Sequence, residues 1–121
     1  MLEFRNETER LILRKSASTL PKSFALHSAY PNPFNPTTTL NYDLPEQSNI
    51  TLTVYDLTGR SITQLVNTIQ QPGFKSVQWN ATDMYGKPVS AGIYLYQIQA
   101  RQNDDGQAGG FVQTKKMVLL K

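Results

Sequence analysis

Short runs in which apolar and polar residues alternate constrain the fold of this chain more than any other feature. Such runs cover residues 37–44, 50–55, 74–80 and 93–100. Period-two alternation is typical of a β-strand with one buried face, because successive side chains point to opposite sides of a sheet. In the first two runs we expect these residues to face the core: Thr38, Leu40, Tyr42, Leu44, Ile50, Leu52 and Val54.

Turn residues separate these runs at short intervals. Pro45, Gly59, the Pro72-Gly73 pair and Gly86 lie between or after them. About six or seven short strands with a turn roughly every ten residues predict an antiparallel β-sandwich rather than a parallel sheet. The run at residues 93–100 has apolar side chains on both faces, which predicts a central strand. Trp79, the only tryptophan, is expected to anchor the core.

Residues 61–70 are ambiguous by periodicity. Ile62, Leu65, Val66 and Ile69 follow the i, i+3, i+4, i+7 spacing of a helix. The segments on both sides are clear strands, so we predict a strand here too, with a bulge or break near Gln64. A short edge strand is also expected at residues 24–27.

Three prolines alternate with other residues in one stretch that we call the strap, residues 30–36. Each proline fixes its own φ, removes a backbone donor and disfavours the helical region for the residue before it. We therefore expect the strap to be extended and stiff, and to stay outside the interior of a sheet. Its two rings, Tyr30 and Phe34, are expected to pack on the end of the sandwich. Residues 1–23 are interpreted as a linker or the tail of an upstream domain, and residues 24–121 as the folded domain.

Composition excludes several classes of function. Of the net charge of +3, residues 1–23 carry +2, so the domain is nearly neutral and offers no basic face for nucleic acid. The chain has no cysteine, and no apolar run is long enough to span a membrane. The N-terminus lacks the pattern of a secretory signal, so we expect any export signal to lie elsewhere.

No motif for catalysis or for a cofactor is present. We find no phosphate loop, dinucleotide fingerprint, metal motif or nucleophile with an evident base, so we predict no enzyme and no cofactor. His27, the only histidine, is assigned a surface or packing role. Asp104-Asp105 and the loop with Asn80 and Asp83 have oxygen ligands suited to Ca²⁺, although solvated turn residues are the favoured interpretation.

Two further groups of residues leave alternatives open. Tyr55, Tyr85 and Tyr94 could form an exposed platform for sugars, but cross-strand pairs and core edges are favoured. Lys115 and Lys116 lie in the middle of the last expected strand. They are equally compatible with an electrostatic docking pair and with an edge strand that lysine protects from unwanted pairing.

Several motifs, in this order along the chain, resemble one known family. They are Tyr30-Pro31-Asn32-Pro33-Phe34-Asn35-Pro36-Thr37-Thr38-Thr39-Leu40, Val54-Tyr55-Asp56-Leu57-Thr58-Gly59-Arg60, Gly73, Trp79, Gly86, Ser90-Ala91-Gly92-Ile93-Tyr94-Leu95-Tyr96 and Lys115-Lys116-Met117-Val118-Leu119-Leu120-Lys121. Together they resemble the C-terminal sorting domains of the type IX secretion system, from about Phe24 to the last residue. The middle motifs also look similar to immunoglobulin-like modules of flagellar hook-capping proteins.

The resemblance implies an immunoglobulin-like antiparallel β-sandwich of about seven strands, without catalysis, at the C-terminus of a larger exported protein. Such a domain directs its cargo from the periplasm through the outer-membrane translocon, and the product is secreted or held at the cell surface. A sortase-like peptidase often removes it, and cleavage ahead of the domain would fall near residues 16–23. The resemblance assigns turn geometry to Gly59 and Gly92. It assigns the sorting signal to Lys115, Lys116, Met117, Val118, Leu119, Leu120 and Lys121.

The chain departs from the family in two respects. A large cargo domain is missing, which suggests a fragment, and the hairpin at residues 103–110 is longer and acidic. The alternative to a sorting module is a structural module, or one that binds carbohydrate or calcium, within a larger extracellular protein. An enzyme is the third alternative, and no group of residues supports it.

Overall fold

The alternating runs form strands in a computed structural model that describes residues 20–102 and 110–121. The strands are β1 (Ala25–Leu26), β2 (Thr38–Leu44), β3 (Ser48–Asp56), β4 (Ser61–Gln70), β5 (Gly73–Trp79), β6 (Gly92–Arg101) and β7 (Phe111–Leu119). This confirms the predicted all-β fold of about seven strands. Within the described ranges there is no helix that could cross a membrane.

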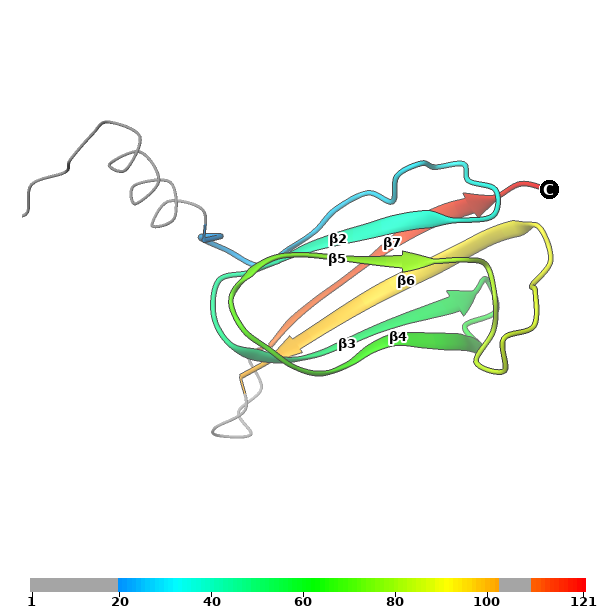
Figure 1. The fold of residues 1–121 in the computed structure, drawn as a ribbon. Coiled ribbons are helices and arrows are strands. Elements are labelled where there is room, and N and C mark those ends of the chain that lie inside the picture. The colour runs from blue at the N-terminus through cyan, green and yellow to red at the C-terminus, as the bar shows by residue number, and fades with distance from the viewer. Residues whose placement is uncertain (1–19, 103–109) are drawn as a thin grey trace, which may run out of the picture.

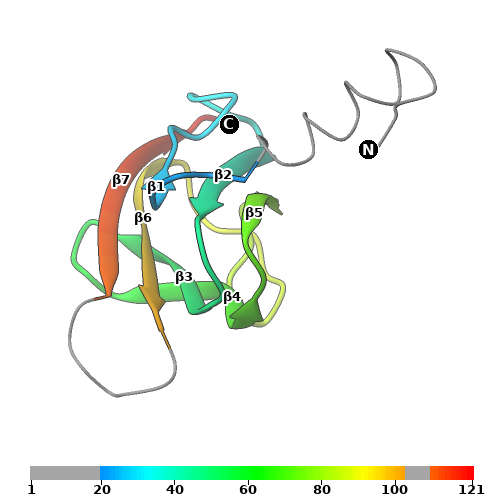
Figure 2. The same cartoon turned by 90° about the vertical axis from the view of Figure 1, so that its left-hand side faces the viewer.

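The strands form two antiparallel sheets that pack face to face (Figures 1 and 2). One sheet has the order β1-β2-β5, and the other has the order β4-β3-β6-β7. β6 pairs with both β3 and β7, so the prediction of a central strand is confirmed. β7 is an edge strand, and β1 contacts it from the opposite sheet.

The core lies between the sheets, where the side chains expected from the first two alternating runs are all buried. Trp79, at the end of β5, is also buried, as predicted. Its ring meets Tyr94 edge-on at a centroid distance of 5.3 Å and lies 5.7 Å from the ring of Phe34. The indole N–H donates to the carbonyl oxygen of Thr82 at 2.9 Å, so the one polar atom of the ring is satisfied.

Two β-bulges explain the helix-like spacing of β4. Leu52 pairs with Val66 and Thr53 with Gln64, which leaves Leu65 as an extra residue. A second register shift two residues on leaves Ile62 extra. Each bulge sets two residues of one strand against one of its partner, so strict alternation is lost. The predicted strand with a break near Gln64 is confirmed.

The strap, residues 30–36, differs from the expectation in two ways. Its chain changes direction at residues 31–33 and 35–36 instead of running straight. Phe34 is 2% exposed, as expected, but Tyr30 is 78% exposed and does not pack on the sandwich. Tyr30 pairs through its backbone with Thr39, whose neighbours on β2 point into the core. Paired residues share a face of a sheet, so Tyr30 is directed to solvent.

Candidate functional site

The strap binds along the C-terminal end of β7. The amide of Phe34 donates to the carbonyl oxygen of Val118, and the amide of Leu120 donates to the carbonyl oxygen of Phe34, both at 2.9 Å. The side chain of Asn32 adds two bonds: its Nδ2 donates to Lys116 O at 3.3 Å, and its Oδ1 accepts from Val118 N at 2.9 Å. Phe34 and Leu119 therefore form a short parallel bridge beside β7, where Figure 1 shows the strap next to the end of that strand.

These bonds close only part of the outer edge of β7. In an antiparallel strand, every second residue turns both backbone groups to the same side. The backbone N–H and C=O of Val118 face the strap, so those of Thr114 and Val112 point outward from the same edge. No described residue bonds to the backbone groups of Thr114 or Val112. The strap thus covers the edge of β7 at residues 116–120 and leaves it open at residues 112–114.

The expected signal residues divide into buried and exposed groups. Met117 and Leu119 are fully buried and belong to the core. Lys115 shares their face of β7 and is half-buried, whereas Lys116 is exposed on the opposite face, across from Leu95 of β6. Lys115 and Lys116 therefore do not form one docking pair on a single face. Lys116, Leu120 and Lys121 are the exposed members of the segment.

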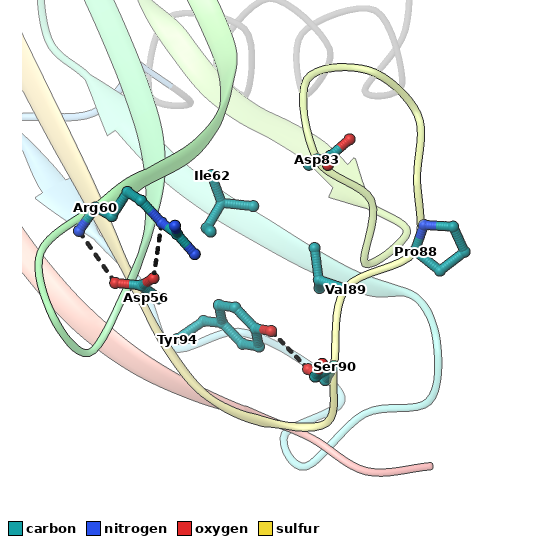
Figure 3. Close-up of a pocket in the computed structure, with 8 residues that line it drawn as sticks. All are labelled: Asp56, Arg60, Ile62, Asp83, Pro88, Val89, Ser90 and Tyr94. Atoms are coloured by element: carbon teal, nitrogen blue, oxygen red, sulfur yellow. Dashed lines mark hydrogen bonds and ion pairs between the residues drawn. The ribbon is translucent and has the colours of Figure 1, made fainter.

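A groove at the same end of the sandwich forms a second candidate site. It lies between the β3–β4 turn and the loop of residues 80–91, and we call it the end groove. One part has a volume of about 380 Å³, and Figure 3 shows its lining residues: Asp56, Arg60, Ile62, Asp83, Pro88, Val89, Ser90 and Tyr94. An adjoining part of about 290 Å³ is lined by Arg60, Ser61, Ile62, Asp83, Met84 and Tyr85. Arg60, Ile62 and Asp83 line both parts, so the two parts lie side by side.

Asp56 holds one wall of the end groove in place. Its Oδ1 accepts bonds from the hydroxyl and amide of Thr58 and from the amide of Arg60, at 2.5, 2.9 and 3.0 Å. Its Oδ2 lies 3.4 Å from Arg60 Nε. The Thr58 hydroxyl bond and then the Arg60 amide bond lower the pKa of the Asp56 carboxyl. The turn also uses Gly59 at a φ of 90°, a conformation that favours glycine.

The opposite wall is the loop that carries Asp83. Its Oδ1 accepts from the amides of Tyr85 at 2.9 Å and Lys87 at 3.0 Å, so this carboxylate shapes the loop. In the described part of the chain, no three carboxylate, histidine or cysteine side chains come together as a metal site would need. The other calcium candidate, Asp104-Asp105, lies outside the described residues.

The three tyrosines of the sugar-platform alternative do not lie together. Tyr94 is only 6% exposed, and its hydroxyl donates to the carbonyl oxygen of Ser90 at the floor of the end groove (Figure 3). Burial and the nearby Asp56 charge raise the pKa of that hydroxyl. Tyr55 lies on the outer face of the four-stranded sheet, opposite Leu95. The burial of Tyr94 contradicts the platform alternative, in which this ring is exposed, and agrees with the favoured interpretation of core edges and cross-strand pairs. Tyr85, 80% exposed, is the most open of the three.

Several other positions can now be placed. His27 is exposed, and its Nε2 lies 2.9 Å from Asp43 Oδ2, which fits the predicted surface role. Gly92 opens β6 with a φ of 151°. Sequence reasoning did not single out the side chain of Asn32 or the pairing of Asp56 with Arg60. No local pattern signals the role of Asn32, because its partners lie more than 80 positions away, whereas Asp56 and Arg60 are four residues apart in one turn.

A family model described as "FlgD Ig-like domain" matches residues 33–104. A search of curated proteins found no match. Among solved structures, FlgD from P. aeruginosa superposes with a TM-score of 0.54 and 26% identity, over 68% of this chain and 60% of that chain.

Two structures from Porphyromonas gingivalis share the fold at lower identity. Dimeric latent PorU matches with a TM-score of 0.63 and 22% identity, over 83% of this chain and 10% of that chain. PorZ, described as an essential bacterial surface component of the type IX secretion system, matches with a TM-score of 0.50 and 18% identity, over 86% and 12%. This chain therefore spans only about a tenth of either protein, and the likeness shows the fold alone.

Proposed function

The chain belongs to the family of FlgD Ig-like domains, and from that premise we propose that residues 24–121 form a non-catalytic sorting and anchoring module. In this proposal the module directs an exported protein through the type IX secretion system to the cell surface. The observation that carries it is the junction of strap and β7. The two ends of the sequence signature, at residues 30–36 and 115–121, are joined there by four hydrogen bonds.

The junction supports the proposal because it presents both parts of the signature as one surface. A receptor that read only one linear segment would not require the two to meet. The fold likeness to PorZ, named as part of the type IX system, adds support at the level of the fold. The surface that a translocon would read is formed by Lys116, Leu120 and Lys121, because Met117 and Leu119 are committed to the core.

The test is export of a reporter fused to residues 1–121 in a host with a type IX system. Deletion of residues 111–121 would be uninformative, since it removes core residues and unfolds the domain. We therefore choose the exposed double variant Lys116→Glu/Lys121→Glu. It should retain its melting temperature, because both side chains are in solvent, and should lose export.

The matched control is Lys87→Glu, which reverses an exposed lysine in the loop of residues 80–91. Its export should equal that of the unmodified fusion. Normal export of the double variant would refute this reading of the signal. Failure of the unmodified fusion to be exported would refute the sorting function itself.

Cleavage by a sortase-like peptidase is proposed for residues 16–23. Mass spectrometry of the released reporter should place the new C-terminus within that segment. A cut inside residues 24–121, or a reporter that keeps the whole module, would contradict this part of the proposal.

A structural module within a larger extracellular protein is the second candidate. The observation in its favour is that PorU and PorZ each contain this fold as a small share of a long chain. Such a module would not export a foreign reporter, so the same fusion separates the two functions.

A further inference from the structure

The end groove has a rigid wall that the proposed sorting function does not use. The amide of Met84 donates to the carbonyl oxygen of Ile62 at 3.1 Å, which attaches the loop to β4. Within the loop, Asp83 N donates to Lys87 O at 2.8 Å, Gly86 N to Asp83 O at 2.9 Å, and Val89 N to Ala81 O at 3.0 Å. A loop held by this many bonds needs little ordering when a ligand binds, so the groove is preorganised.

Two large side chains on this loop contribute little to the fold. Tyr85 is 80% exposed and Met84 is 59% exposed, and both line the groove. A tyrosine ring that is fixed at its backbone but uncovered offers a flat apolar face with a polar tip. Because Tyr85 lines the groove and is uncovered, its ring is open to a ligand that lies there.

The groove also contains polar groups with bonding capacity left over. Asp56 engages Arg60 through Nε, and no other described residue pairs with the two terminal nitrogens of the guanidinium; Figure 3 shows the group lying between Asp56 and Ile62. Among the described residues, Asp83 uses only Oδ1, which leaves Oδ2 as an acceptor. Arg60 and Asp83 line both parts of the groove, so a ligand that crosses it meets a planar donor and a planar acceptor.

We infer that the end groove binds a neutral oligosaccharide, with one sugar ring stacked on Tyr85 and its hydroxyl groups bonded to Arg60 and Asp83. Arg60 is paired with Asp56, and Asp83 adds one further negative charge, so the groove disfavours an anion, and its described residues include no cluster of carboxylates that would hold a cation. A polyol satisfies donor and acceptor together, since each hydroxyl can donate and accept. This binding function is separate from export and does not rest on it.

The test begins with an array of neutral oligosaccharides that includes cellohexaose and maltohexaose, probed with residues 1–121. Hexalysine and oligogalacturonate serve as cationic and anionic probes. We expect at least one neutral oligosaccharide to bind with a Kd below about 1 mM, the range in which weak specific binding is measurable by titration calorimetry. If no neutral oligosaccharide on the array binds at about 1 mM, the inference is wrong.

Variants then locate the site. Tyr85→Ala should weaken the best neutral ligand about tenfold or more, and Arg60→Gln should also weaken it. Tyr30→Ala is the matched control, because Tyr30 on the strap is exposed (78%) to nearly the same extent as Tyr85. This control variant should bind the same oligosaccharide with an affinity within about twofold of that of the unmodified protein. Unchanged affinity in both groove variants, or preferential binding of hexalysine or oligogalacturonate, would refute the inference. Export of the Tyr85→Ala fusion should be normal, so the two proposals fail independently.

Discussion

Replacing Phe34 with alanine tests whether the strap is held by its one buried ring. Phe34 is 2% exposed and lies 5.7 Å from Trp79 between ring centroids. A buried phenylalanine removes roughly 200 Å² from water, which at about 25 cal/mol per Å² is worth up to about 5 kcal/mol. Measured Phe→Ala costs in cores are roughly 3–5 kcal/mol. The strap lies at the end of the sandwich and can relax into the space, so we expect about 3 kcal/mol.

The assay is urea unfolding followed by Trp79 fluorescence, together with a thermal melt. A loss of about 3 kcal/mol corresponds to a decrease in melting temperature of roughly 12–24 °C for a domain of this size. Limited proteolysis should also show faster cleavage ahead of residue 30. Tyr30→Ala is the control in the same segment and should change stability by less than about 0.5 kcal/mol, since that ring is in solvent. Equal stability of the two variants, or unchanged protease sensitivity in Phe34→Ala, would refute the reasoning.

Three further predictions concern single interactions. The pKa of Asp56 is lowered from its ordinary value of 3.8, so the stabilisation by its carboxylate is present above that value and is lost as pH falls through the folded-state pKa. In a plot of the urea midpoint against pH, Asp56→Asn should therefore lose less stability in acid than the unmodified protein. Parallel curves for the two proteins would contradict this. Burial raises the pKa of Tyr96, so the stability of the domain should fall as pH rises above 10.0, and Tyr96→Phe should reduce that alkaline loss. At neutral pH the same variant loses the hydrogen bond to His27 O and should be less stable by about 1 kcal/mol in urea titrations. Gly59→Ala meets no neighbour but keeps a φ of 90°, so a thermal melt should show a loss of about 1 kcal/mol, and an unchanged melt would be inconsistent with that strain.

The strands were predictable because their signal is local. In β2 and β3 the apolar side chain alternates with a polar one, so the buried face follows directly from the sequence. β4 was harder, since its two bulges shift the phase twice and reproduce the spacing of a helix. The clear strands on either side favoured a strand for this segment as well.

The errors arose where a side chain's direction depends on distant partners. In β6 both faces carry apolar groups, so alternation could not tell whether Tyr94 points in or out. Tyr94 is buried because its ring packs against Trp79 of the opposite sheet. Tyr30 faces solvent because of its pairing with Thr39. The end groove combines the β3–β4 turn with the loop after β5, and no motif in either segment indicates the other.

The junction of strap and β7 has a consequence for how the chain matures. Asn32 reaches its partners at Lys116 and Val118 across 84 and 86 positions of sequence. Closing a loop of that length costs roughly 4 kcal/mol in chain entropy beyond a constant, and that cost is offset only when the last strand has joined its sheet. The first residue of the strap can pair with Thr39 as soon as β2 has formed, but Asn32 and Phe34 have no partners on β7 until the final residues arrive. The domain thereby registers its own completion, because a chain that ends before Val118 cannot form the hydrogen bonds that hold Phe34, the ring next to Trp79, at the end of the sandwich.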